Sequence, residues 1–114
     1  MKHHTINYIE FAAPDLEKIK AFYGKAFGWE FTDYGPDYVA FNDGFIDGGF
    51  EKGEVRNQGQ PLVILYSENL ETSQQAIKEA GGKIVRPIFS FPGGRRFHFT
   101  DPCDNELAVW SDKK

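Results

Sequence analysis

The sequence predicts an α+β fold made of two tandem copies of one strand–helix–strand–strand–strand module. Asp-Leu-Glu at residues 15–17 recurs as Asn-Leu-Glu at 69–71, and both motifs follow an apolar run and open a helical pattern. At the same offset, Gly28 matches Gly82. This internal similarity and the shared order of elements indicate a duplicated unit. The last two strands flank Asp-Pro-Cys-Asp-Asn at 101–105, which is typical of a hairpin turn because proline and Asx residues favour turns.

Module one, residues 5–50, opens with a strand over 5–13 and a helix. Asp15 is expected to cap the helix by accepting backbone N–H bonds, and Gly28 is expected to end it in the left-handed conformation. Strands over 29–33, 38–41 and 45–50 follow, and the glycines at 48–49 indicate a bulge or a close approach. Apolar side chains at helical spacing predict one buried helix stripe: Leu16, Ile19, Phe22, Tyr23, Ala26 and Phe27.

Module two, residues 61–112, repeats this order after a polar linker over 51–60. A strand over 61–67 leads into a helix capped by Asn69, and the glycines at 81–82 stop that helix. A strand over 83–89, a loop over 91–94 and the final hairpin complete the module. The predicted buried stripe of this helix consists of Leu70, Ala76, Ile77 and Ala80.

Composition limits the classes of partner. A chain of 114 residues is expected to form a single domain, 1–114, with a sizeable core, and its 11 Phe suit sheets that enclose something. A net charge of −4 without a basic run argues against nucleic acid or an anionic membrane as partner. Because no apolar stretch approaches roughly 20 residues and the start Met-Lys-His-His lacks a hydrophobic segment, we expect neither a membrane span nor a signal segment. With Cys103 as the one cysteine, we expect a reduced, cytoplasmic protein.

With these elements the chain resembles the vicinal oxygen chelate superfamily, which includes glyoxalase I, bleomycin-resistance proteins, fosfomycin-resistance proteins and extradiol dioxygenases. In module one the resemblance rests on the helix from Asp-Leu-Glu at 15–17 through Phe-Tyr at 22–23, and on Phe-Gly-Trp at 27–29. In module two it rests on the helix end Ala-Gly-Gly at 80–82 and on the final hairpin turn within 99–107. It covers essentially the whole chain. It implies paired βαβββ modules whose curved sheets form a cup, and a homodimer in most small members, sometimes with modules exchanged between chains.

The resemblance also implies where a metal would bind. Metal-dependent members carry ligands early on the first strand of each module, usually His, and Glu on each last strand. These places map onto Tyr8, Leu62, Ala108 and, approximately, Gly48. Three of the four lack a side-chain donor, whereas first-row metals prefer imidazole, carboxylate or thiolate, so we expect no metal and no cofactor. Glu106 is expected on the same side as Ala108 and would be the nearest rescue ligand, whereas Asp47 is expected on the opposite face to Gly48.

Period-two alternation separates two faces of the strands. One is apolar and should pack under the helices; it carries Ile9, Phe11, Val63, Leu65, Phe97, Phe99, Leu107 and Val109. The other mixes aromatic, apolar and charged side chains, which is the composition of a ligand pocket. Its predicted members are Tyr8, Glu10, Leu62, Ile64, Tyr66, Arg96, His98, Glu106, Ala108 and Trp110.

Glu10 and His98 are the candidate catalytic residues, since carboxylate and imidazole are the usual proton-transfer groups. Two simpler interpretations stay open: an ion pair between Glu10 and Arg96, and an exposed rim position for His98. His3 and His4, near the terminus, are expected to be mobile and to point apart.

The leading hypothesis is a metal-free, dimeric protein that binds a small molecule in an aromatic cup. Its acidic balance would suit a cationic or neutral ligand. Whether it catalyses a reaction is left open, and the alternative is a metal-free isomerase or lyase that uses Glu10 or His98 as acid–base. A metal-dependent lyase or dioxygenase fits the ligand positions poorly. Two ferredoxin-like halves without a pocket would leave the final hairpin signature unexplained.

Overall fold

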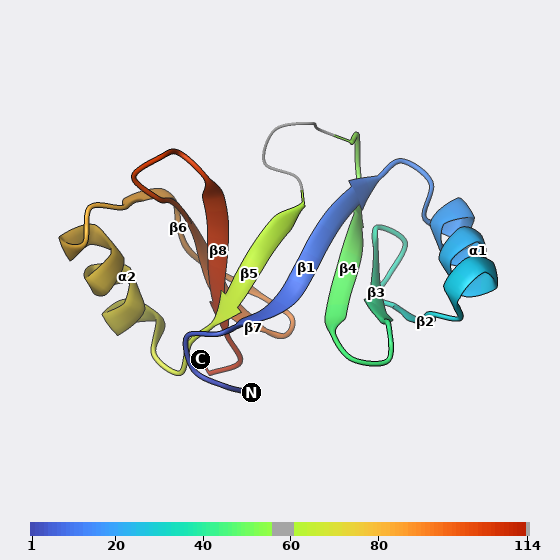
Figure 1. Ribbon diagram of the computed structural model, residues 1–114, viewed down its shortest axis with the longest axis horizontal. Coiled ribbons are helices and arrows are strands. Elements are labelled where there is room, and N and C mark those ends of the chain that lie inside the picture. The colour runs from blue at the N-terminus through green and yellow to red at the C-terminus, as the bar shows by residue number, and fades with distance from the viewer. Residues whose placement is uncertain (56–60, 114) are drawn as a thin grey trace. The chain divides into compact units, whose positions relative to one another are not determined.

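The computed structural model describes residues 1–55 and 61–113 and confirms the α+β order of elements in both modules (Figure 1). Residues 56–60 of the predicted linker lie outside the described residues. Among the described residues, no helix is long and apolar enough to cross a bilayer. Module one consists of β1 (Ile6–Ala13), α1 (Leu16–Phe27), β2 (Glu30–Asp33), β3 (Tyr38–Asn42) and β4 (Asp47–Lys52). Module two consists of β5 (Leu62–Tyr66), α2 (Leu70–Glu79), β6 (Lys83–Phe91), β7 (Gly94–Thr100) and β8 (Glu106–Ser111).

The chain forms two units, whose boundary falls inside β1. Tyr8–Pro61 forms the module-one unit, and Met1–Asn7 groups with Leu62–Lys114 in the module-two unit. Within module one the strand order is β2-β3-β4-β1, and within module two it is β5-β8-β7-β6. In each module the first strand pairs in parallel with the last strand, and the other pairs are antiparallel. The two halves therefore share one topology, as duplication predicts.

Both helices begin at the predicted caps. Asp15 Oδ1 accepts a hydrogen bond from the Lys18 backbone N–H at 3.0 Å, and Asn69 Oδ1 accepts one from that of Thr72 at 3.0 Å. Each cap satisfies a donor that the first helical turn leaves without an internal partner. Gly28 ends α1 with φ of 73°, the left-handed conformation that was expected there.

The core of module one lies between α1 and its sheet. Ala13, Leu16, Val39, Phe41 and Phe50 are buried there, and the cluster is extended by Phe11, Ile19, Tyr23, Trp29 and Phe31. The predicted helix stripe was too wide: Phe22 and Phe27 are 58% and 65% exposed, and Ala26 is also exposed. The helix packs on this core mainly through Leu16, Ile19 and Tyr23, a narrow stripe at i, i+3 and i+7.

The core of module two contains the fully buried Leu70 and Phe97 with Val109, and the predicted helix stripe again needs correction. Ala76 and Ala80 are exposed, and the buried position between Leu70 and Ile77 is Ser73. A buried hydroxyl is tolerated because its hydrogen bonds are satisfied. Ser73 Oγ lies 2.7 Å from Ser67 Oγ and 2.8 Å from His4 Nε2.

The same contact overturns the expectation of a mobile terminus. His3 Nδ1 accepts the Glu68 backbone N–H at 2.9 Å, and the His3 and His4 rings stack with centroids 3.7 Å apart. The two rings do not point apart, because His4 adopts φ of 59° in place of the extended conformation. Hydrogen bonds from both histidines hold the terminus on module two.

Candidate functional site

The candidate site begins with an irregular edge strand, β6. Its register against β7 shifts between Ile84 and Arg86 and again between Arg86 and Phe89. Simple alternation would place Arg86 on the helix side with Ile84, but the extra residue between them turns Arg86 to the opposite face. The second shift restores the original alternation, so Phe89 lies on that opposite face as well. Arg86 pairs with His98, Phe89 pairs with Arg96, and Ile84 and Ile88 pack into the core. Pro87 lies between the two shifted pairs, at an edge position where proline is tolerated.

His98 is buried on this face, at 6% exposure, so the expectation of an exposed rim residue is wrong. Its backbone pairs with Ala108 on β8, and its Nδ1 lies 3.0 Å from Glu106 Oε2, one diagonal position along that strand. Since a carboxylate only accepts hydrogen bonds, Nδ1 carries the proton and donates it to Glu106. Within the described part of the chain, His98 Nε2 is buried and has no hydrogen-bond partner.

Burial lowers the pKa of His98 from its ordinary value of 6.5, and the positive charges of Arg96 and Arg86 lower it further, whereas the hydrogen bond and charge of Glu106 raise it. The net direction is downward, which makes the ring neutral at physiological pH. A neutral ring with its proton on Nδ1 presents a bare lone pair at Nε2. That atom can accept a hydrogen bond from a bound molecule or take a proton from it.

Most of the other predicted members on module two lie on the same face. Ile64 pairs with Ala108, and both are buried, at 2% and 0% exposure, as is Leu62 at 6%. Trp110 is half-buried; its Nε1 donates to Asn7 Oδ1 at 3.0 Å. Tyr66 is buried, and its hydroxyl donates to Asp112 Oδ1 at 2.6 Å, next to the Trp110 ring. Arg96 Cζ lies 5.5 Å from the centroid of the Phe89 ring.

On module one, the predicted pair Tyr8 and Glu10 comes together around a third residue, Tyr38. Tyr38 Oη donates to Glu10 Oε2 at 2.9 Å and lies 2.7 Å from Tyr8 Oη. Burial raises the pKa of Tyr38 far above its ordinary value, and the charge of Glu10 adds to that shift, so the phenol keeps its proton and donates it. Glu10 is only 6% exposed, and its carboxylate accepts the Tyr38 hydrogen bond.

The register corrects two module-one positions. Tyr8 pairs with Asp47, Ile9 with Gly48, and Glu10 with Gly49, and residues that pair share a face of the sheet. Gly49, not Gly48, is therefore the counterpart of Ala108, and Asp47 lies on the face of Tyr8 although the opposite face was expected. Pairing is regular on both sides of β4, so the glycines mark close approach and not a bulge.

The positions that the resemblance assigns to metal ligands do not fit a metal. Leu62 and Ala108 have no donor atom. A Cβ added at Gly49 would collide with the Tyr38 hydroxyl and lie 2.6 Å from Tyr8 Oη, so the space that a ligand side chain would need there is filled by tyrosine. In the part of the chain that the structure describes, no three His, Cys, Asp or Glu side chains gather closely enough to hold a metal ion.

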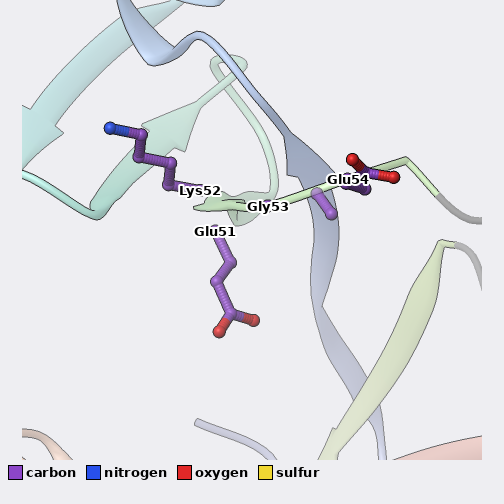
Figure 2. A pocket seen from close by; sticks show the side chains of 5 residues that line it. Glu51, Lys52, Gly53 and Glu54 are labelled. Carbon is purple, nitrogen blue, oxygen red and sulfur yellow. The ribbon is translucent and has the colours of Figure 1, made fainter.

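A separate hollow of about 310 Å³ lies at the end of β4 and is lined by Ala12 and residues 51–54. Figure 2 shows that Glu51, Lys52 and Glu54 extend in different directions, so their charged ends do not converge on a common point. A hollow without converging polar groups lacks the chemistry of a recognition site. The described groups with the properties of a site lie instead around His98.

Three residues of these faces were missed by sequence reasoning: Tyr38, Arg86 and Phe89. Gly49 was a signal for Tyr38, because a glycine inside a strand indicates that another group approaches closely. Pro87 was a signal for Arg86, because proline inside a strand pattern indicates an edge or a bulge, and an inserted residue reverses the alternation beside it. Phe89 lies on the face that alternation from Ile84 already gives.

Comparison with known proteins supports the same family. Residues 5–109 match the model of the Glyoxalase/Bleomycin resistance protein/Dioxygenase superfamily. No curated protein matches the chain. A Mn(II)-bound glyoxalase from Novosphingobium aromaticivorans has a similar fold, with a TM-score of 0.70 and 21% identity; the match covers 98% of this chain but only 40% of that protein.

Two smaller proteins are matched over most of their length. A glyoxalase/bleomycin resistance protein/dioxygenase superfamily member from Vibrio splendidus 12B01 has a TM-score of 0.66 at 17% identity, over 94% of this chain and 98% of that one. Methylmalonyl-CoA epimerase from Mycobacterium tuberculosis has a TM-score of 0.67 at 10% identity, over 93% and 86%. At these identities the structural likeness shows the fold alone. The sequence match over nearly the whole chain, joined to the duplicated βαβββ topology, shows that the protein belongs to the glyoxalase/bleomycin resistance protein/dioxygenase superfamily.

Proposed function

We propose that the protein binds a small molecule, without a metal, on the module-two face around His98, and that this molecule donates a hydrogen bond to His98 Nε2. The observation that carries the proposal is the buried Nε2, which no described residue satisfies. Leaving a buried polar atom without a partner costs about 1–3 kcal/mol, and native proteins rarely leave one without a reason.

The surroundings of His98 support binding of an apolar or aromatic body. The Phe89 ring lies 6.0 Å from the His98 ring, centroid to centroid, and the buried Ala108 and Ile64 share the face. Apolar walls with a small number of oriented polar groups are the usual composition of small-molecule sites. The hydroxyl or N–H of a ligand would satisfy Nε2, and its apolar part would pack against Phe89.

A second candidate function, metal-free acid–base catalysis, is favoured by the contact between His98 and Glu106. Glu106 holds the Nδ1 proton at 3.0 Å and would stabilise the imidazolium that forms when Nε2 takes a proton from a substrate. In this arrangement the C–H or O–H bond of the substrate breaks, its electron pair stays on the substrate, and the proton moves to Nε2. Returning that proton to a neighbouring atom would complete an isomerisation.

The binding proposal is tested with two probes that differ in one donor, 3-hydroxybenzamide and 3-methoxybenzamide. We expect the hydroxyl compound to bind about fivefold more tightly, the worth of one hydrogen bond, in NMR titrations of the protein. His98→Asn is the matched variant, because its amide nitrogen replaces Nδ1 opposite Glu106 while Nε2 is lost. The variant should remove the difference between the probes. Equal affinities in the wild-type protein would refute the hydrogen bond to Nε2.

A further inference from the structure

We propose that Arg86 anchors a carboxylate of the ligand beside His98, so that the natural ligand of this face is an anion. The inference deepens the proposed function and rests on it. It departs from the cationic or neutral ligand that the net charge of −4 suggested, because charge close to the site outweighs charge spread over the surface.

The first argument is the position of Arg86. The register shift between Ile84 and Arg86 places Arg86 directly opposite His98, on the same face of the sheet. β-Bulges are frequent beside functional sites, where they re-aim a side chain. Here a bulge in the edge strand brings Arg86 opposite His98, close enough for its charge to act on the His98 ring.

The second argument is how Arg86 is held. Its Cζ lies over the Phe89 ring, 3.8 Å from the centroid. A guanidinium over an aromatic face keeps its N–H groups at the edge of the stack, where they can still donate. Stacking also limits the rotamers of a long side chain, so less entropy is lost when a ligand binds.

The third argument is the local charge. Arg95, the neighbour of Arg96 on β7, is neutralised by Glu71, with N···O distances of 2.7 and 3.2 Å. No carboxylate of the described residues pairs in this way with Arg86, and the carboxylate of Glu106 is directed at His98. The positive charges of Arg86 and Arg96 both act on the His98 ring.

A carboxylate is the anion that suits this arrangement. It is planar and singly charged, and its two oxygens match the fork of one guanidinium, whereas a phosphate dianion calls for more donors. A ligand that carries a carboxylate for Arg86 and a hydroxyl or N–H for His98 Nε2 would satisfy both groups at once. The substrate class is therefore an acid with a hydrogen-bond donor on an apolar or aromatic body.

The test compares 3-hydroxybenzoate with 3-hydroxybenzamide, which differ in charge and little in shape. We expect the wild-type protein to bind the benzoate about tenfold more tightly in NMR titrations, the worth of a charge-assisted hydrogen bond. Arg86→Gln should remove this preference, so that the variant binds the benzoate and the benzamide with equal affinity. Lys83→Gln is the matched control, since it removes one positive charge from the same strand at an exposed position, and it should keep the preference.

The outcomes separate this inference from the proposed function. Equal binding of benzoate and benzamide by the wild-type protein overturns the anion anchor, while the preference for hydroxyl over methoxy would still support the hydrogen bond to Nε2. A loss in Lys83→Gln as large as that in Arg86→Gln also overturns it, because the preference would then reflect general charge. Absence of the hydroxyl preference refutes the proposed function itself.

Discussion

Gly49→Ala is expected to destabilise module one strongly, although it adds a single methyl group. The added Cβ would collide with the Tyr38 hydroxyl and approach Tyr8 Oη to 2.6 Å. Tyr38 would then have to move away, and its hydrogen bond to the buried Glu10 carboxylate, now 2.9 Å, would lengthen or break. The substitution thus disturbs the hydrogen bond that satisfies the buried Glu10 carboxylate on this face of module one.

The magnitude has two parts. Overpacking by a methyl group costs about 1–3 kcal/mol, and losing a hydrogen bond to a charged group costs about 1.5–3 kcal/mol. We therefore expect the free energy of unfolding, measured by urea denaturation, to fall by about 2.5–6 kcal/mol. Gly53→Ala is the control, because nothing lies within 4 Å of a Cβ added there, and we expect it to be neutral or slightly stabilising.

A double-mutant cycle tests the cause. In a Tyr38→Phe background the hydroxyl is absent, so Gly49→Ala should cost less than it does in the wild-type protein, with a coupling of about 1 kcal/mol or more. Two results would refute the reasoning: a loss below about 0.5 kcal/mol for Gly49→Ala alone, or strict additivity of the two substitutions.

Three further predictions concern module two. Phe97→Ala removes a fully buried ring from the core and should lower the free energy of unfolding by about 3–5 kcal/mol in urea; a loss below about 1 kcal/mol would contradict the packing. Glu106→Gln should lower the pKa of His98 further, because the hydrogen bond and charge of Glu106 raise it; an NMR titration that shows a rise would count against this. The pKa of His98 is lower in the folded protein than its ordinary value of 6.5 in the unfolded chain. Between these two pKa values the unfolded chain therefore binds more protons than the folded protein. The wild-type protein should therefore lose stability relative to His98→Asn as pH falls from 6.5 to the folded pKa, and a pH-independent difference in urea denaturation would contradict this.

The sequence predicted what local chemistry controls. Asp15 and Asn69 cap their helices because an N-cap needs only a short polar side chain and the next turn of backbone. The order of elements followed from periodicity, and the two-module fold followed from the repeat. Placement of His98 and Glu106 on one face followed from alternation, which holds along the regular β7 and β8 pair.

The errors came from contacts that alternation cannot represent. The bulge between Ile84 and Arg86 reverses the face of Arg86, and periodicity cannot show an inserted residue. Tyr38 on β3 reaches Glu10 on β1 across the intervening strand β4, a tertiary contact that only the adjacent glycine indicated. Mobility was inferred for His4 from its position near the terminus, but its hydrogen bond to Ser73, 69 residues away in the sequence, cannot be inferred from position alone. The homodimer and the cytoplasmic location stay predictions.

The most direct test of the account is the protonation state of the His98 ring in the free protein, read from the ¹⁵N chemical shifts of its two nitrogens at neutral pH. The account predicts a neutral ring with the proton on Nδ1, held by Glu106, and a bare Nε2 whose signal shifts when 3-hydroxybenzamide is added. A proton on Nε2, or on both nitrogens, would contradict it, because no lone pair would then be available to a ligand.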